Sequence, residues 1–169
     1  INPGTDFEDN TEYYFKIAGT AFDDVDSGSY AGISSKTDRS FTTTNTIPTL
    51  ISSVPDNNAT DVALDATIVL NFSENVDTES GNITIKKTSG NAVVETINVT
   101  DTDIVIGTGT SQITIIPSSN FDNDTEYYVL IANTAFDDSD SGSYAGISST
   151  TALSFTTINS IPTLTSSVP

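Results

Sequence analysis

Residues 121–169 read FDNDTEYYVLIANTAFDDSDSGSYAGISSTTALSFTTINSIPTLTSSVP, and this stretch decides how the chain divides into domains. Residues 7–55 have nearly the same sequence, FEDNTEYYFKIAGTAFDDVDSGSYAGISSKTDRSFTTTNTIPTLISSVP. The two copies are offset by 114 residues without a gap, and 36 of their 49 positions are identical. A period of this length is too long for a solenoid repeat and matches one β-sandwich domain of roughly 100 residues. The sequence therefore predicts domains of one kind in tandem array.

Proline-containing junctions set the expected domain boundaries. The segments 47–50 and 161–164 both read Ile-Pro-Thr-Leu, and each follows shortly after a Phe-Thr-Thr string. Because proline cannot donate to a strand ladder, it suits a junction between the last strand of one domain and the first strand of the next. We expect a complete domain at residues 46–159, the last strands of a preceding domain at 1–45, and the first strand of a following domain at 160–169.

Alternating apolar and polar residues predict an all-β fold. Ile68, Leu70 and Phe72, for example, fall on one face of a strand, and no segment shows a clear 3.6-residue period. The predicted strands are 49–54, 67–72, 82–87, 93–99, 104–106, 112–116, 125–132 and 152–157. Seven or so short strands separated by turn residues at this spacing describe a β-sandwich.

The repeat also indicates which face of one late strand is buried. Lys16 in the first copy is replaced by Leu130 in the second, which indicates that the face carrying Tyr14 and Lys16 is exposed to solvent. Successive side chains of a strand point to opposite faces. The residues expected in the core are therefore Tyr13, Phe15 and Ile17, with Tyr127, Val129 and Ile131 in the second copy.

Composition removes several classes of function. The 169 residues contain 23 acidic and 5 basic residues and no histidine, for a net charge of −18. Such a field repels phosphate backbones, and there is no basic stripe, so we expect no nucleic-acid partner. Without histidine or cysteine the common catalytic triads and thiol mechanisms are excluded, and we expect no enzyme. The apolar runs are only strand-length, so this segment should not insert into a membrane.

Several strings resemble the bacterial immunoglobulin-like repeats found in S-layer proteins and giant repeat adhesins. They are Ser52–Val62, Leu70–Asp77, Thr125–Tyr128 and Ser154–Thr157, in the order of that family. The resemblance implies an immunoglobulin-like β-sandwich of about seven strands on the bacterial cell surface or outside the cell. It also implies a structural role in an extracellular filament or an adhesin stalk, whose partners are neighbouring identical repeats or subunits.

The string Thr-Glu-Tyr-Tyr also resembles the tyrosine corner of sandwich domains. In that feature a tyrosine near the start of a late strand forms a hydrogen bond between its hydroxyl and the backbone a few residues upstream. The resemblance assigns this role to Tyr127 and, in the first copy, to Tyr13.

The most distinctive polar motif is the acidic loop DDSDSGS at residues 137–143, which returns as DDVDSGS at residues 23–29. Three carboxylates within four residues repel one another unless they are solvated or bridged by a cation. Ca²⁺ takes six to eight oxygen ligands from carboxylates, carbonyls and water. The candidate Ca²⁺ ligands are Asp137, Asp138 and Asp140, with Asp23, Asp24 and Asp26 in the first copy.

Two alternatives accompany the calcium hypothesis. The spacing is not that of an EF-hand, so the loop can also be a solvated acidic turn that aids solubility. If calcium binds, it would neutralise the repulsion and stiffen the array. A second acidic segment, Glu74–Glu79, is expected to be a solvated turn, and the alternative is that it meets a neighbouring loop.

Two further alternatives concern the role of the whole chain. The domain can be a ligand-binding module whose loops recognise a glycan or a host protein. Against this, the loop Phe22–Ser35 returns almost unchanged as Phe136–Ser149, whereas binding loops tend to diversify. Residues 1–45 belong either to a continuous array or to a strand exchange that completes the sandwich of another molecule.

Overall fold

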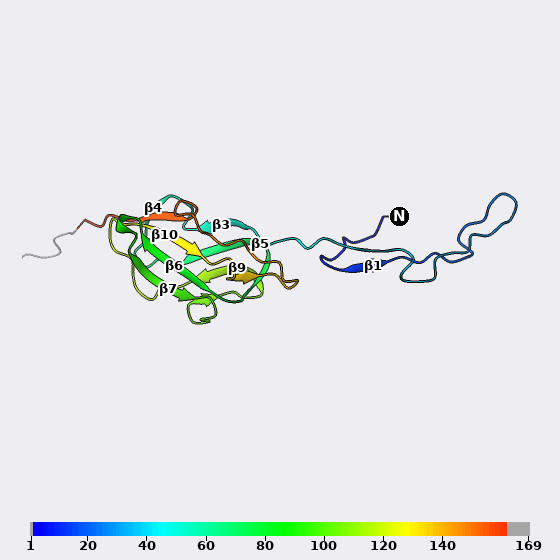
Figure 1. Cartoon of the computed structure of the whole chain (residues 1–169). Helices are drawn as coiled ribbons and strands as arrows, with labels where there is room; N and C mark the ends of the chain where they lie inside the picture. The colour runs from blue at the N-terminus through cyan, green and yellow to red at the C-terminus, as the bar shows by residue number, and fades with distance from the viewer. Residues whose placement is uncertain (1, 162–169) are drawn as a thin grey trace, which may run out of the picture. The chain divides into compact units, whose positions relative to one another are not determined.

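The computed structural model describes residues 2–161, which divide into two compact units. The N-terminal unit extends to Thr46, and the C-terminal unit begins at Ile47. Figure 1 draws them in blue and in cyan to red, respectively. The predicted first strand of a following domain, at 160–169, lies outside the described residues from position 162 onward.

The described part of the C-terminal unit is built from strands, with no α-helix. Its strands are β3 (Leu50–Val54), β4 (Ala59–Val62), β5 (Ile68–Thr78), β6 (Asn82–Lys87), β7 (Val93–Asn98), β8 (Val105–Ile106), β9 (Thr110–Ile115), β10 (Glu126–Ile131), β11 (Phe136–Asp137) and β12 (Ser154–Thr157). A short 3₁₀ turn, Ser89–Asn91, joins β6 to β7. The prediction of an all-β fold is confirmed.

These strands form two five-stranded sheets (Figure 1). One sheet has the order β4-β12-β10-β6-β7, and the other has the order β11-β5-β9-β8 with β3 also paired to β5. All of these strand pairs are antiparallel except β4 with β12. That pair is parallel and joins residues almost a hundred positions apart in the sequence. β5 has β3 and then β11 along one edge and β9 along the other.

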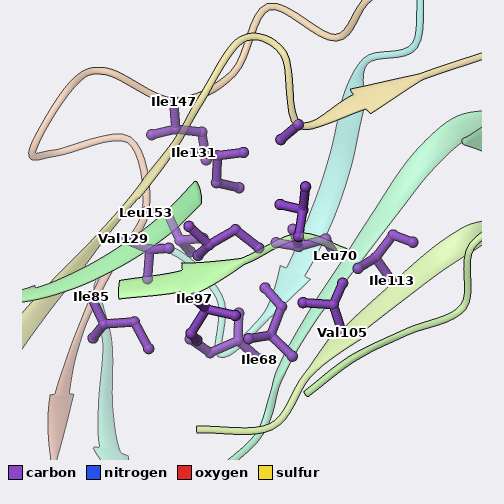
Figure 2. Packing of buried hydrophobic residues seen from close by; sticks show 14 of the residues in the cluster. Ile68, Leu70, Ile85, Ile97, Val105, Ile113, Val129, Ile131, Ile147 and Leu153 are labelled. Atoms are coloured by element: carbon purple, nitrogen blue, oxygen red, sulfur yellow. The ribbon is translucent and has the colours of Figure 1, made fainter. Parts of the chain in front are cut away.

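A single apolar core lies between the two sheets. Ile68, Leu70 and Phe72 point inward from β5, as their alternation predicts, and Ile83 and Ile85 point inward from β6. Figure 2 shows side chains of both sheets packed together in this core. Because each large side chain buried there contributes about 1.5–3 kcal/mol, this layer supplies most of the stabilisation of the unit.

Both faces of β10 are covered, although the sequence predicted burial of only one of them. Tyr127, Val129 and Ile131 lie in the core as expected. Tyr128 lies on the opposite face and is also buried, so the prediction that this face is exposed is wrong at that position. The Tyr128 hydroxyl donates to Asn91 Oδ1 at 3.1 Å, and the Lys86 ammonium lies 5.8 Å from the centre of its ring. The β6–β7 connection therefore covers a ring that strand periodicity alone leaves exposed.

β5 is longer than its predicted extent. The alternation of apolar residues ends at Phe72, but the strand continues to Thr78. The expectation that Glu74–Glu79 is a turn is wrong for most of the segment. β11 pairs with its end, placing Phe136 opposite Thr78 and Asp137 opposite Asp77. The partner strand comes from a region almost sixty residues away, so local sequence carries no signal for it.

The N-terminal unit reproduces one corner of this sandwich. Its described strands are β1 (Glu12–Tyr14) and β2 (Ser40–Thr42), which pair with each other in an antiparallel ladder. Tyr13 lies opposite Phe41 just as Tyr127 lies opposite Phe155 in the C-terminal unit. In the C-terminal unit β6 and β4 flank this pair, whereas the described part of the N-terminal unit has no strand in either place.

Candidate functional site

The acidic loop of the C-terminal unit is a tight hairpin organised by Asp138. The Asp138 N–H donates to the Gly142 carbonyl at 2.9 Å, and the Ser141 N–H donates to the Asp138 carbonyl at 3.2 Å. Its carboxylate oxygen Oδ1 accepts from the N–H groups of Asp140, at 2.7 Å, and Gly142, at 2.8 Å. One side chain thus holds the whole turn together, because Asp readily bonds backbone groups within two to four residues.

The same hairpin also contains two carboxylate oxygens that no group among the described residues satisfies. Asp138 is only 8% exposed, and its second oxygen, Oδ2, is buried without a hydrogen-bond partner within residues 2–161. Oδ1 of the adjacent Asp137 is buried in the same way. A buried carboxylate oxygen is costly unless water, a proton or a cation compensates for it.

A third carboxylate approaches this point from β5. Asp77 lies directly opposite Asp137 in the β5–β11 ladder, where the two side chains leave the same face of the sheet. Like charges in this arrangement are destabilising. Asp77 is partly compensated, because its Oδ1 accepts from the Thr108 hydroxyl at 3.2 Å. Across residues 2–161, however, no three acidic side chains converge into a metal-binding group.

The first copy of the loop adopts the same hairpin in a different environment. Oδ1 of Asp24 accepts from the N–H groups of Asp26, at 2.9 Å, and Gly28, at 2.7 Å. Asp23, Asp24 and Asp26 are all exposed there, whereas Asp138 is buried. The hairpin is therefore encoded by its own residues, and its first role is to form a turn.

The tyrosine corner is present in both units. The Tyr127 hydroxyl accepts from the Asp122 N–H at 2.7 Å, and the Tyr13 hydroxyl accepts from the Glu8 N–H at 2.9 Å. Both bonds reach back five residues to the segment that precedes the strand. The two assignments made from the sequence are confirmed, and the bond fixes how the chain enters β10 and β1.

Three aromatic rings form the same cluster in both units. In the C-terminal unit the ring centres of Phe121, Tyr127 and Phe155 are 4.8, 5.2 and 5.7 Å apart. The equivalent separations for the counterparts Phe7, Tyr13 and Phe41 are 4.5, 5.2 and 5.9 Å. The angle between the tyrosine ring and the ring across the ladder is 26° in each unit. The cluster thus has the same geometry in both units.

What differs between the units is burial. Phe41 is 42% exposed and Phe22 is 61% exposed, whereas their counterparts Phe155 and Phe136 are 1% and 0% exposed. An open apolar groove results in the N-terminal unit, lined by Pro3, Phe7, Tyr13, Tyr14, Phe15 and Phe41. Sequence reasoning placed Tyr13 and Phe15 in a core and so missed this surface.

Two sheets packed face to face, a tyrosine corner and the strand order of the C-terminal unit define the class of immunoglobulin-like β-sandwich domains. Within that class, a family model described as "Bacterial Ig-like domain" matches residues 44–157, and the chain belongs to this family. The resemblance noted from the sequence is thereby confirmed.

Solved structures similar to the chain include two of bacterial S-layer proteins. One is the S-layer protein rSbsC(31-844), with 13% identity and a TM-score of 0.43; the match covers 70% of this chain and 14% of that one. The other is the N-terminal part of the bacterial S-layer protein SbsC, with 14% identity and a TM-score of 0.45, covering 70% and 25%. The chain therefore spans at most a quarter of either S-layer chain.

A third similar structure is PcoC, a copper resistance protein from Escherichia coli, with 22% identity and a TM-score of 0.38 over 64% of this chain and 98% of that one. No match was found among curated proteins. In the part of the chain that the structure describes, no helix has the length and apolar character of a membrane span.

Proposed function

We propose that the chain is a structural repeat segment of a long protein on the bacterial cell surface, either an extracellular filament or the stalk of an adhesin. In this proposal residues 46–159 are one repeat, residues 1–45 are the last strands of the preceding repeat, and residues 160–169 begin the next. Neighbouring identical repeats are the partners of each unit. The unit performs no chemistry and acts as a spacer.

One observation carries this proposal: the 114-residue repeat preserves structural features that contain no nucleophile–base pair. Both copies keep the tyrosine corner, the aromatic cluster and the Asp-centred hairpin. Histidine and cysteine are absent from the whole chain, so the repeated loops carry none of the usual nucleophile–base pairs. Repetition of a scaffold without a reactive group supports a spacer whose length is set by the number of units.

Force spectroscopy on a chain with several 114-residue cassettes tests the spacer role. Each sandwich should unfold as one unit, and each event should release about 38–41 nm of chain less the end-to-end length of the folded unit, since an extended chain spans about 3.3–3.6 Å per residue. A matched chain with an Ile85→Asp substitution in one cassette should show one event fewer. A single event for the whole array, or no resistance to force, would contradict independent mechanical units.

The proposal has a second, separable part, in which Ca²⁺ binds the Asp137–Asp140 loop and stiffens the array. It is supported by two buried oxygens that have no hydrogen-bond partner in the part of the chain that the structure describes, Asp137 Oδ1 and Asp138 Oδ2, and by Asp77 opposite Asp137. These oxygens suit Ca²⁺, which prefers carboxylate, carbonyl and water ligands. In the first copy, Asp23, Asp24 and Asp26 are the corresponding candidates.

Thermal unfolding with calcium and with a chelator tests the calcium part. Calcium should raise the melting temperature of the C-terminal unit, because a ligand that binds only the folded state stabilises it. The matched variant is Asp138→Asn, which keeps an acceptor for the Asp140 and Gly142 N–H groups and removes the charge. It should lose the calcium response while retaining the fold. If melting is the same with calcium and with chelator, the calcium part is wrong and the scaffold part stands.

A further inference from the structure

β4, near the beginning of the C-terminal unit, lies beside β12, near its end, and the two strands run in the same direction. Where the pair begins, the Asn58 N–H donates to the Ser154 carbonyl at 2.7 Å. Where it ends, the Ile158 N–H donates to the Val62 carbonyl at 2.9 Å. Two segments almost a hundred residues apart in the sequence are therefore joined directly by backbone hydrogen bonds.

The shared direction decides how tension would act on this pair. In a tandem array, force enters the unit near Ile47 and leaves it beyond β12, near Ile161. Because the strands are parallel, this force draws the beginning of β4 and the end of β12 in opposite directions along the strand axis. The bonds of a parallel pair are evenly spaced, so they are loaded together. A pull across a ladder instead loads its bonds one after another.

Asn57 adds side-chain bonds at the beginning of the pair. Its Nδ2 donates to the Thr151 carbonyl at 3.0 Å, and its Oδ1 accepts from the Ser154 N–H at 2.9 Å. The Ser154 side chain is 5% exposed, and its hydroxyl donates to Asn58 Oδ1 at 3.2 Å. One amide therefore links the turn before β4 to the beginning of β12 with both a donor and an acceptor.

β3 precedes this pair on the path of the force, but it contributes little to the core. Of its apolar residues only Leu50 packs against the core, whereas Ile51 and Val54 are 68% and 58% exposed. Release of β3 from β5 therefore leaves most of the sandwich closed. β12 carries Phe155, which is 1% exposed, so β12 cannot separate without opening the core. The bonds between β4 and β12 are thus the last direct connection between the two ends of the unit.

We propose that residues 57–62 and 151–158 form a mechanical clamp that sets the force at which the unit opens, and that Asn57 holds the beginning of this clamp. The inference rests on the proposed spacer role, since only a unit under tension uses such a clamp. It extends that role, because it assigns the resistance to one strand pair and one amide side chain.

The test is single-molecule force spectroscopy on the 169-residue chain held at two chosen points. The sequence has no cysteine, so paired cysteine substitutions define the points of attachment. Ile47→Cys with Ile161→Cys, the clamp attachment, uses two exposed positions and loads β4 and β12 along their length. Val93→Cys with Glu126→Cys, the cross-sheet attachment, pulls across β7, β6 and β10. At equal force the folded unit should survive at least about tenfold longer in the clamp attachment, because two or more additional hydrogen bonds break in its limiting step.

Substitution of Asn57 shows whether this side chain holds the clamp. Asn57→Ala removes both amide bonds and should shorten the lifetime in the clamp attachment by about tenfold, with little change in the cross-sheet attachment. Asn57→Asp keeps the acceptor for the Ser154 N–H and loses the donor, so its effect should be intermediate. The matched control is Gln112→Ala, which removes a 2.8 Å amide bond to Asn71 between β9 and β5. It should change neither lifetime.

A longer lifetime in the clamp attachment, with an Asn57→Ala effect confined to that attachment, would support the inference. Equal lifetimes in the two attachments would overturn it. So would an equal effect of Asn57→Ala on both, since a side chain that only stabilises the fold acts whatever the direction of the pull. Thermal unfolding of each variant establishes that it is folded, and Asn57→Asp replaces Asn57→Ala if the latter does not fold. The spacer role is tested separately, by the number and length of the unfolding events.

Discussion

Replacing the equivalent phenylalanine in each copy of the repeat tests how much of its contribution to stability depends on burial in the sandwich. Phe155→Ala removes a ring that is 1% exposed and lies 5.2 Å from the ring centre of Phe121 and 5.7 Å from that of Tyr127. Truncating a buried phenylalanine costs about 3–5 kcal/mol, the sum of lost transfer free energy and the cavity left behind. Two aromatic contacts, each worth about 0.5–1.5 kcal/mol beyond burial, place the expected loss in the upper part of that range.

The assay is unfolding in urea and by heat, followed by tyrosine fluorescence and near-ultraviolet circular dichroism because the chain has no tryptophan. A unit of this size loses about 4 °C of melting temperature per kcal/mol, so a loss of about 4–5 kcal/mol for Phe155→Ala should lower it by about 16–20 °C. Phe41→Ala makes the same chemical change where the ring is 42% exposed. It should leave the transition of the C-terminal unit unchanged. Equal shifts for the two variants, or no shift for Phe155→Ala, would refute this account of the core.

Three further predictions concern a glycine with positive φ, the aspartate of the acidic hairpin and a buried tyrosine. Gly146 has φ of 74° and an added Cβ would lie 2.5 Å from the Ile131 carbonyl oxygen, so Gly146→Ala should cost at least about 1–3 kcal/mol in urea unfolding, whereas Gly32→Ala should not shift this transition. Asp138→Ala leaves two backbone N–H groups without their acceptor and should cost about 1–3 kcal/mol, but Asp138→Asn should cost much less. Burial raises the pKa of Tyr144 above 10.0, so the folded state holds its phenolic proton more tightly, and the free energy of unfolding should fall as pH rises above about 10. Tyr144→Phe should flatten part of that fall in alkaline melts, and a slope equal to the parent's would contradict the assignment.

The salt bridge between Lys87 and Asp122 acts in the same alkaline range. The hydrogen bond and charge of Asp122 raise the pKa of Lys87 above 10.5. Its contribution to stability is therefore complete at neutral pH and is lost as pH rises through the raised pKa. Because both partners are partly exposed, this contribution is small and sensitive to salt.

Much of the fold was predictable because its signals are local. The alternation of Ile68, Leu70 and Phe72 predicted a buried strand face, and the core confirms it. The strands predicted at 104–106 and 112–116 correspond to β8 and β9. The second half of β5 and the short β11 were missed, since neither has an alternating pattern and both depend on pairing with distant strands.

The sequence predicted the acidic motif, but it could not predict which residues surround that motif in the folded unit. The sequence singled out Asp137, Asp138 and Asp140 by their spacing. The structure shows that Asp138 holds the turn and that Asp77, from the segment expected to be a turn, faces Asp137. The approach of Asp77 depends on a pairing across almost sixty residues, which no local pattern encodes.

Comparison of the two copies distinguishes what the local sequence determines from what depends on tertiary structure. The sequence by itself determined the Asp24 and Asp138 hairpins and the tyrosine corners of Tyr13 and Tyr127, which are alike in both units. Their bonds join residues no more than five positions apart, so they form wherever those residues occur. Only the tertiary structure decided burial: Phe136 lies in a core and its twin Phe22 does not. Removing a side chain from water requires a second apolar sheet, and that sheet comes from residues far away in the chain.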